Sequence, residues 1–261
     1  MTVRWPAEAI WEQVAPLLPG FTVEILPQID STNTELMRRA RAGRPEPILL
    51  VAERQTAGRG RLGRDWQSDT DAGLSTLTFS LGLPLQPADW SGLSLAVGLA
   101  VVQSLHPALK LKWPNDVWLD ERKLAGILIE TTSVGDLRYA VIGIGVNLLP
   151  RAADGLRTPP AALVELLPVA NAPSTLEAIL PPLVRAVLAF EHQGFGELRS
   201  AFHARDLLYG REVLCTDGTT GTARGVDAGG ALLVHTAGGL QKISSAEVSV
   251  RPLAANPSKD L

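Results

Sequence analysis

Residues 47–66, with the sequence PILLVAERQTAGRGRLGRDW, join two segments of opposite character. The first segment is a continuous apolar run, which predicts a β-strand buried on both faces. The second, from Gln55 to Trp66, holds three arginines and three glycines and reaches its first acidic residue at Asp65. Arginine suits bidentate capture of phosphate or carboxylate, and glycine permits unusual backbone angles. We therefore interpret this segment as a flexible lid that closes over an anion, with a solvated surface loop as the alternative.

Further strands and helices are predicted on both sides of this stretch. Apolar patterns predict strands at residues 21–29, 73–83, 109–113 and 138–149, and a hairpin at 117–130 that turns at 120–122. Helices are predicted within residues 1–20 and at 30–43, 91–105, 174–193 and 196–208. Thr32, with Glu35 three residues later, is the expected N-cap of the second helix. Pro181 and Pro182 are expected to end one helix and open another.

The character of the chain changes at Tyr209. Four short apolar segments follow, at 211–215, 222–226, 231–235 and 240–244, separated by turns that contain glycine. This pattern predicts a small antiparallel sheet or barrel. We therefore expect an α/β (α+β) protein with strands and helices at residues 1–208 and a small β domain at residues 209–261; a mixed β-sheet with flanking helices is what the family resemblance described below implies.

The overall charge argues against two classes of partner. The 261 residues hold 24 Lys+Arg against 27 Asp+Glu, so no general field attracts nucleic acid or an anionic membrane. A single cysteine, Cys215, excludes a disulfide framework and cysteine-rich zinc sites. The N-terminus has no apolar segment typical of a secretory signal, and the longest apolar run, residues 93–105, is shorter than a membrane span. We expect a cytoplasmic protein that binds neither DNA nor a membrane.

Two glycine motifs of nucleotide-binding proteins are incomplete or missing. Residues 143–148, GIGVNL, begin like a dinucleotide fingerprint, but Leu148 occupies the place of the third glycine. The phosphate-binding pattern GxxxxGK[ST] does not occur in the sequence. If the protein uses a nucleotide, it must bind it in another way.

Two lysines stand at positions that suit an anion site. Lys112, in KLKWPND, is predicted on the face of a strand opposite its apolar residues, just before a turn. Asp116 in that turn is a candidate Mg²⁺ ligand, because Mg²⁺ usually takes one or two protein carboxylates. Lys123 begins the next strand, and Gly126 stands three residues later. A glycine inside a strand often marks a place where a ligand approaches the backbone closely. Solvated strand and turn residues are the alternative for each.

Five segments together resemble the biotin protein ligases. They are DSTNTEL (30–36), QTAGRGRLGRDW (55–66), LKWPNDV (111–117), RKLAGILIE (122–130) and IGIGVNL (142–148). They occur in the family's order and at similar separations, and the C-terminal β domain also fits. The resemblance implies a class II synthetase-like catalytic domain that binds biotin and ATP at residues 1–208, followed by an SH3-like β-barrel at 209–261.

The resemblance also implies roles for individual residues. Biotin is expected to contact Ser31, Thr32, Asn33, Gln55, Gly58, Arg59, Gly60, Arg61, Trp66, Lys123 and Gly126. ATP and the adenylate are expected to contact Arg61, Arg64, Lys112, Trp113, Asn115, Asp116, Lys123 and Asn147. Lys123, Arg61 and Lys112 are the expected catalytic residues, and Asp116 is either an Mg²⁺ ligand or a base. Leu62 replaces an arginine that is common in the family's loop.

The implied activity is ATP-dependent attachment of biotin, through biotinyl-5′-AMP, to a lysine of a biotin carboxyl carrier domain. ATP and Mg²⁺ are the implied cofactors, and the family often forms homodimers. The segment before Ser31 is too short for the DNA-binding winged helix that some members carry, so we expect the monofunctional form. A lipoate–protein ligase, a non-enzymatic biotin-responsive regulator and a general nucleotide-binding module are the alternatives.

Overall fold

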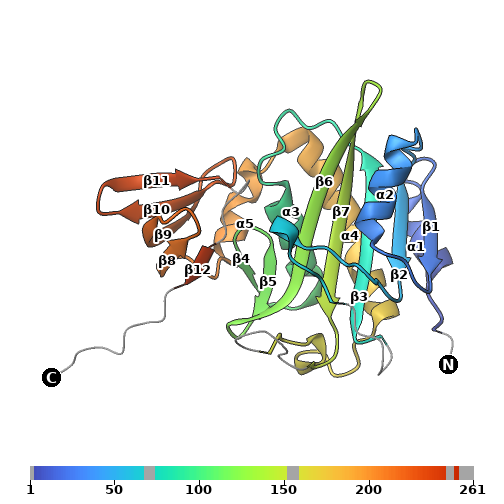
Figure 1. Ribbon diagram of the computed structural model, residues 1–261, viewed down its shortest axis with the longest axis horizontal. Coiled ribbons are helices and arrows are strands. Elements are labelled where there is room, and N and C mark those ends of the chain that lie inside the picture. The colour runs from blue at the N-terminus through green and yellow to red at the C-terminus, as the bar shows by residue number, and fades with distance from the viewer. Residues whose placement is uncertain (1–2, 68–73, 152–158, 245–249, 253–261) are drawn as a thin grey trace.

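A computed structural model describes the chain outside residues 1–2, 68–73, 152–158, 245–249 and 253–261. Within the described residues, seven strands form one sheet in the order β1-β2-β3-β7-β6-β5-β4, and five strands form a second, smaller sheet (Figure 1). In the large sheet β1 and β2 are parallel, whereas the other neighbouring pairs are antiparallel. The large sheet is therefore mixed, as the family resemblance implies.

The elements of the larger part follow the predicted order. Its strands are β1 (Thr22–Leu26), β2 (Ile48–Ala52), β3 (Thr76–Pro84), β4 (Lys110–Lys112), β5 (Asp116–Leu119), β6 (Arg122–Val134) and β7 (Leu137–Asn147). Its helices are α1 (Ala7–Val14), α2 (Thr32–Arg41), α3 (Leu93–Leu105), α4 (Ala172–Gln193) and α5 (Arg199–His203), with 3-10 turns η1 (Arg61–Gly63), η2 (Leu163–Glu165) and η3 (Gly196–Leu198). β5 and β6 form the predicted hairpin, and its turn residues Asp120 and Glu121 have φ angles of 45° and 63°.

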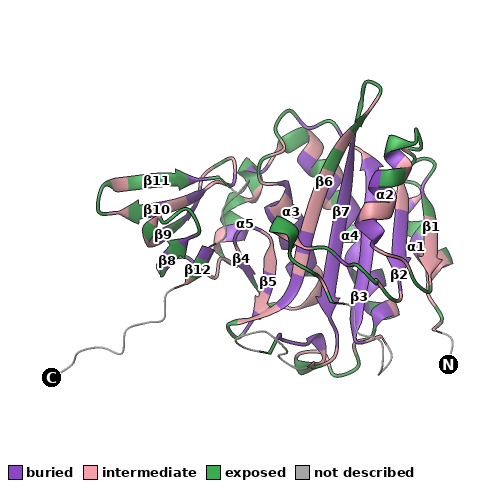
Figure 2. Cartoon of the chain, viewed as in Figure 1, coloured by how far each residue is buried: buried purple, intermediate pink, exposed green. Residues whose placement is uncertain are grey.

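Helices cover both faces of the large sheet (Figure 1). Residues of α1, α3 and α4 share the larger apolar core with one face, and α2 packs on the other face over a smaller core. β2 supplies both cores: Leu49 and Val51 join the larger one, whereas Leu50 joins the smaller one. Alternate residues of a strand point to opposite faces, so a continuous apolar run suits a strand that is covered twice. Figure 2 shows β2, β3 and β7 as the most continuously buried strands.

The start of α2 differs from the sequence prediction by one residue. Ser31 is the N-cap, and its Oγ accepts a hydrogen bond from the backbone N–H three residues later. Thr32 is instead the first helical residue, and its Oγ1 donates to Gln55 Oε1 at 3.0 Å. Glu35 forms ion pairs with two arginines of the same helix. Local spacing could not reveal Gln55 as the partner of Thr32, because the two residues are far apart in sequence.

The prediction of a break in α4 is wrong. Asn171 caps the helix, accepting from Ser174 N at 3.0 Å, and the helix continues through Pro181 and Pro182. A proline inside a helix costs about 3 kcal/mol, because it removes a hydrogen bond and crowds the preceding turn. The buried face of α4, which includes Leu183, offsets that cost by packing in the core. Among the described residues α4 is the one helix long and apolar enough to cross a membrane, and half of that window is buried inside the protein.

The C-terminal region is an antiparallel sheet with the strand order β11-β10-β9-β8-β12. Its strands are β8 (Glu212–Cys215), β9 (Thr220–Val226), β10 (Leu232–Thr236), β11 (Gly239–Ile243) and β12 (Val250–Pro252), the last of which the sequence pattern does not predict. Several polar contacts join it to the larger part, among them a hydrogen bond from Arg199 Nε to Val226 O at 2.8 Å and an ion pair between Arg211 and Glu121. Trp113 Nε1 donates to Gly230 O at 3.0 Å, and Val226 N donates to His203 Nε2 at 3.1 Å. The smaller sheet is therefore attached directly behind the turn that follows β4.

Candidate functional site

An open cavity, with about 460 Å³ of empty space that includes part of the solvent at its mouth, lies on the α2 side of the large sheet. Segments that are far apart in sequence surround it. They are the start of α2, the loop after β2, the Gly–Arg segment (residues 58–66) and strands β3, β6 and β7. Its lining residues are Ser31, Thr32, Asn33, Gln55, Arg59, Gly60, Arg61, Trp66, Thr78, Phe79, Asn115, Lys123, Gly126, Ile127, Leu128, Gly143, Ile144 and Gly145. The lining combines uncharged polar groups, apolar groups and three cations.

One wall of the cavity is a chain of uncharged polar side chains that bond one another. Gln55 Oε1 accepts hydrogen bonds from Thr32 N at 2.7 Å and from Thr32 Oγ1 at 3.0 Å. The Ser80 hydroxyl lies 2.7 Å from both Thr32 Oγ1 and Asn33 Oδ1, so its single proton serves one of them at a time. Ser80, Thr32 and Asn33 are buried. Because each of these groups has a partner, the polar wall is held in one arrangement.

Asn33 is fixed at the far end of the polar wall. Its Nδ2 donates to Leu128 O at 3.2 Å and to Glu130 Oε2 at 3.0 Å. Both partners are acceptors, so the amide nitrogen must face them and Oδ1 must face Ser80. The side chain can therefore present a defined acceptor to a ligand.

Three glycines make room for the side chains of the site. A Cβ at Gly143 would lie 2.0 Å from Asn33 Oδ1, and one at Gly145 would lie 2.3 Å from the Trp66 ring. A Cβ at Gly58 would lie 2.3 Å from the Trp66 carbonyl oxygen. The glycines of β7, which resemble part of a dinucleotide motif in sequence, thus allow close side-chain packing.

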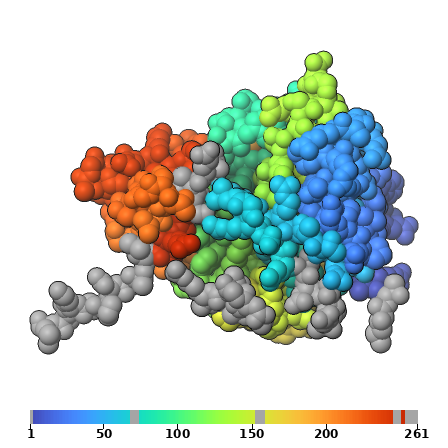
Figure 3. All heavy atoms as spheres, viewed as in Figure 1, coloured from blue at the N-terminus to red at the C-terminus, as the bar shows by residue number. Residues whose placement is uncertain are grey.

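The Gly–Arg segment is a short hairpin. Backbone hydrogen bonds cross it from Trp66 N to Gly58 O at 2.9 Å and from Gly60 N to Arg64 O at 2.7 Å. In Figure 3 this part of the chain, drawn in cyan, projects over the front of the molecule between the blue N-terminal part and the orange C-terminal sheet. The sequence analysis expects flexible backbone here, and the structure shows an internally bonded element.

The tip of the hairpin explains part of its glycine content. Leu62 has φ 57° and ψ 35°, and Gly63 has φ 70°. Two consecutive residues with positive φ form the tight turn that suits a two-residue hairpin. Glycine adopts this conformation easily, whereas for Leu62 it is strained. Leu62 is 51% exposed, so burial of its own side chain contributes little to holding the turn.

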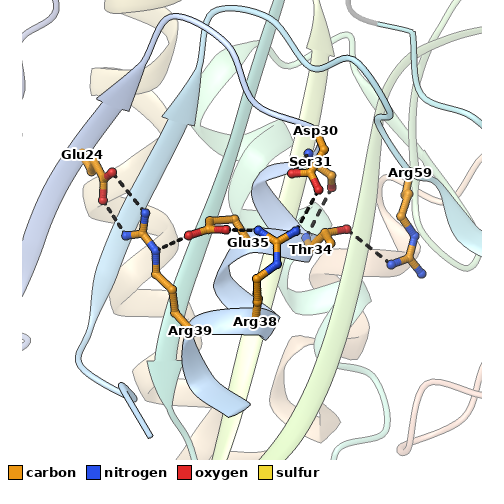
Figure 4. A network of polar contacts seen from close by, with 8 residues as sticks. All are labelled: Glu24, Asp30, Ser31, Thr34, Glu35, Arg38, Arg39 and Arg59. Atoms are coloured by element: carbon orange, nitrogen blue, oxygen red, sulfur yellow. Dashed lines mark hydrogen bonds and ion pairs between the residues drawn. The ribbon is translucent and has the colours of Figure 1, made fainter. Parts of the chain in front are cut away.

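Two arginines of the hairpin point in different directions. Arg61 Nη1 donates to Asn115 Oδ1 at 3.2 Å, and burial lowers the pKa of Arg61, although nearby Asp116 opposes that effect. Arg59 reaches back towards α2, where its Nη1 donates to Thr34 Oγ1 at 3.5 Å (Figure 4). Its guanidinium therefore lies at the mouth of the polar wall, while that of Arg61 lies at the opposite end of the cavity.

Ion pairs on the outer face of α2 hold the start of that helix in place. Figure 4 shows the chain of contacts that runs through Glu24, Arg39, Glu35, Arg38 and Asp30. Asp30 Oδ1 also accepts from Ser31 N at 2.7 Å. Burial alone raises the pKa of Asp30, but the Ser31 N–H and Arg38 hold it below its ordinary value. A negative group beside the first turn of a helix is favourable, so Asp30 helps to fix the N-terminus of α2 at the cavity.

The opposite end of the cavity is cationic. Lys123 Nζ lies 2.8 Å from Asp116 Oδ1 and 6.0 Å from the centroid of the Trp66 ring. Lys112 Nζ lies 5.1 Å from the centroid of Trp118. Burial lowers the pKa of Lys112, while Asp116 opposes this effect. Asp116 is already paired with Lys123, so it cannot fully balance the positive charges around it. An anion that enters this end of the cavity is therefore stabilised.

Sequence comparisons identify the family. The sequence model of the Biotin/lipoate A/B protein ligase family matches residues 25–147, and that of the Biotin protein ligase C terminal domain matches residues 209–251. The chain is 34% identical over 240 residues to the biotin–[acetyl-CoA-carboxylase] ligase of Paracoccus denitrificans, which covers 86% of this chain and 98% of that protein. The chain belongs to the biotin protein ligase family. It is also 36% identical over 255 residues to the bifunctional ligase/repressor BirA of Escherichia coli, covering 92% of this chain and 77% of BirA.

Solved structures of biotin protein ligases share the fold. The biotin protein ligase from Aquifex aeolicus in complex with biotin and ATP has a TM-score of 0.76 and 28% sequence identity, covering 88% of this chain and 99% of that chain. The structure of the same enzyme without ligands gives a TM-score of 0.70 at 26% identity. The mixed sheet, its flanking helices and the C-terminal antiparallel sheet are therefore the family's architecture.

The structure brings most of the residues predicted to bind biotin into one place. All of them except Gly58, which packs behind Trp66, line the cavity. Of the residues predicted to bind ATP, the cavity is lined by Arg61, Asn115 and Lys123. Lys112 and Asp116 line a smaller cavity of about 160 Å³, which shares Asn115 and Ile127 with the first.

Three residues predicted to bind ATP lie outside both cavities. The side chain of Trp113 is buried and faces the C-terminal sheet, because it alternates with Lys112 along the chain. Direct contact between this ring and a ligand in the cavity is therefore not supported. Arg64 is exposed on the hairpin. Asn147 is buried, its Nδ2 donates to Lys123 O at 3.3 Å, and its Oδ1 accepts no hydrogen bond within the described residues.

Several lining residues give little signal in the sequence. They are Thr78 and Phe79 of β3, Ile127 and Leu128 of β6, and Gly143, Ile144 and Gly145 of β7. Ser80, which connects Thr32 to Asn33, is equally inconspicuous. Strand residues of these types usually serve the core, so pattern alone cannot separate a cavity wall from the interior. The two glycines on β7 are the exception, because they stand in the segment IGIGVNL, on which the family resemblance partly rests.

Proposed function

We propose that this protein attaches biotin to a lysine of a carboxylase carrier domain in two ATP-dependent steps. The observation that carries the proposal is one cavity with an uncharged polar wall at one end and fixed cations at the other. Biotin has a polar bicyclic ring at one end and a carboxylate at the other, so the two ends of the cavity match the two ends of the molecule.

The polar wall is assigned to the ring of biotin. Asn33 and Thr32, held by Ser80, offer hydrogen bonds to the ring's urea group, and Gln55 lies beside them. Trp66 supplies apolar surface along the cavity. A ligand with polar atoms at this end gains hydrogen bonds that an analogue without them cannot form. Lipoate, which has no urea group, is therefore disfavoured.

The cationic end is assigned to the first chemical step. The biotin carboxylate attacks the α-phosphorus of ATP, a new C–O–P linkage forms, and pyrophosphate leaves with the electrons of the broken P–O bond. Two unit charges 4 Å apart repel by about 4 kcal/mol at an effective dielectric near 20. Lys123, Arg61 and Lys112 are proposed to offset that repulsion. Catalysis then consists of positioning and charge stabilisation, without a covalent protein nucleophile.

Magnesium enters this proposal as part of the substrate MgATP. Within the described residues no group of three His, Cys, Asp or Glu side chains could hold a metal ion. Asp116 is a single carboxylate, and Lys123 lies 2.8 Å from it. Mg²⁺ bound to nucleotides takes most of its ligands from phosphates and water and needs one or two carboxylates. We assign Asp116 to positioning Lys123, with contact to the nucleotide's Mg²⁺ as its second role.

The second step transfers biotin to the carrier. The lysine amine of the carrier attacks the acyl carbon of biotinyl-AMP, the acyl C–O bond breaks, and AMP leaves while the amine loses a proton. Biotinyl-AMP is an activated acyl phosphate that water can hydrolyse, so it must be sheltered until the carrier docks. The hairpin that carries Arg59 and Arg61 is the element assigned to that shelter.

Mass spectrometry of a purified biotin carboxyl carrier domain tests the function directly. Incubation with the protein, biotin and MgATP should add one biotin to one lysine, and omission of ATP should abolish the addition. An equal yield with lipoate would instead support a lipoate–protein ligase. Biotin-dependent DNA binding without any modification of the carrier would support the regulator.

A further inference from the structure

Glu130, near the middle of β6, is the one residue of the RKLAGILIE segment whose carboxylate reaches both the polar wall and the hairpin. One carboxylate oxygen, Oε2, accepts from Asn33 Nδ2 at 3.0 Å. The other, Oε1, lies 3.4 Å from Arg59 Nη2. Glu130 therefore joins two groups that approach the cavity from α2 and from the hairpin, and its two oxygens do different tasks.

We propose that Glu130 is a positioning residue for biotin, a role that rests on the proposed function. Its carboxylate holds the Arg59 guanidinium at the mouth of the polar wall and, at the same time, keeps the Asn33 amide nitrogen turned away from Ser80. The residue itself does not line the cavity, so it acts through Arg59 and Asn33. Its effect belongs to binding of biotin and leaves the chemical step unchanged.

Burial and charge favour this role over that of an ordinary surface ion pair. The Glu130 side chain is 23% exposed, compared with 53% for Arg59. Asn33 is 4% exposed, so its amide nitrogen has little access to water. A buried amide that loses one acceptor is costly, because the free N–H cannot turn to solvent. Arg59 has a second anchor at Thr34, but at 3.5 Å that contact is long and carries no charge.

Glu130→Gln separates the two contacts. The amide oxygen of glutamine can still accept from Asn33, but the amide has no charge to attract Arg59. We expect the KM for biotin in the pyrophosphate-exchange assay to rise about fivefold, which corresponds to about 1 kcal/mol for a partly exposed ion pair. The KM for ATP and kcat should stay within about twofold of wild type, since an interaction that acts in binding alone changes KM. The difference should shrink at high salt, because salt screens exposed charges.

A double-mutant cycle tests whether Arg59 is the mediator. In an Arg59→Gln background, Glu130→Gln should cause no further rise in the KM for biotin, because the pair is already broken. Asp227→Asn is the matched control: it breaks the ion pair with Lys242 in the C-terminal sheet, its side chain is 22% exposed, and neither residue lines the cavity. That control should keep the wild-type KM for biotin. Thermal unfolding of each variant shows whether the fold is retained.

The outcomes separate this inference from the proposed function. Wild-type protein that forms no biotinyl-AMP overturns both. Wild-type protein that forms it, together with a folded Glu130→Gln variant that keeps the wild-type KM for biotin, overturns the role of Glu130 alone. A fall in kcat with an unchanged KM, or additive effects in the Arg59 background, overturns it as well.

Discussion

The two ends of the cavity are built in opposite ways. At the polar end Thr32, Asn33 and Ser80 are buried, and each is hydrogen-bonded to another protein group. At the cationic end Lys123 is paired with Asp116, and in the adjoining smaller cavity burial lowers the pKa of Lys112. The polar end is complete without a ligand, whereas the cationic end is stabilised when an anion arrives. Under the proposed function, preorganisation serves recognition of biotin at one end, and unbalanced charge serves the adenylation step at the other.

The largest expected effect comes from removing charge at the cationic end. Lys123→Ala should reduce biotin-dependent ATP–pyrophosphate exchange by about a thousandfold, because the cation nearest the carboxylate–phosphate encounter is lost. Biotin binding, measured by calorimetry, should fall much less, since the polar wall is untouched. Lys110→Ala, an exposed lysine on β4, is the control and should retain wild-type exchange. Exchange at the wild-type rate in Lys123→Ala would show that Lys123 does not promote adenylate formation, and the proposed division of roles between the two ends would fail.

Crowding the polar end should give the next largest effect. A Cβ at position 143 would lie 2.0 Å from Asn33 Oδ1, so Gly143→Ala should displace Asn33 and raise the KM for biotin about thirtyfold. The KM for ATP should change little. Gly196→Ala is the matched control, because an added Cβ there meets nothing within 4 Å. Equal increases in both KM values would show that the two ends are not independent.

A smaller effect is expected from loosening the hairpin that spans the two ends. Arg61→Gly removes the hydrogen bond to Asn115 and should let biotinyl-AMP escape before the carrier docks. Biotin labelling of an unrelated bystander protein should then rise severalfold, as measured by blotting with streptavidin. Arg44→Gly, an exposed arginine after α2, should leave bystander labelling at the wild-type level. No increase with Arg61→Gly would argue against the sheltering role.

The smallest effect concerns Asp206, a half-buried acid whose backbone is paired with Leu111 of β4. Burial raises the pKa of Asp206 from 3.8 to about 6, although the Leu208 and Tyr209 N–H groups oppose this. Because the folded-state pKa is raised, its contribution to stability is present below about pH 3.8 and is lost as pH rises through about 6. Asp206→Asn should therefore raise Tm at pH 7.5 by about 2–5 °C, equivalent to about 1–2 kcal/mol. The advantage should vanish near pH 4, and a gain that is independent of pH would contradict this origin.

Much of the fold follows from local pattern. The continuous apolar run of β2, the apolar α3 and the alternation of β4 each report burial directly, and the structure confirms these predictions. The prediction for α4 is wrong because packing against the core outweighs the local effect of Pro181 and Pro182. The N-cap of α2 is displaced for a related reason: Thr32 has a partner, Gln55, that local spacing cannot see.

The site is harder to predict from the sequence than the fold. Short motifs predict most of the charged residues of the cavity, and the structure places these residues together. The sequence assigns no binding role to Ser80 or Glu130, because each acts through a contact with residues distant in sequence. Trp113 stands in a motif beside Lys112, yet strand alternation sends its ring to the C-terminal sheet. Membership of a motif therefore does not reveal the direction in which a side chain points.

The crossed backbone bonds of the hairpin determine how it can move. An element closed by its own hydrogen bonds swings as one piece instead of unravelling residue by residue. Trp66, whose ring is packed so tightly over Gly145 that a methyl group there would clash, anchors one end of the hairpin. Arg59 and Arg61 are carried by the same hydrogen-bonded element, so a displacement of the hairpin as a unit would remove both guanidinium groups from the cavity together.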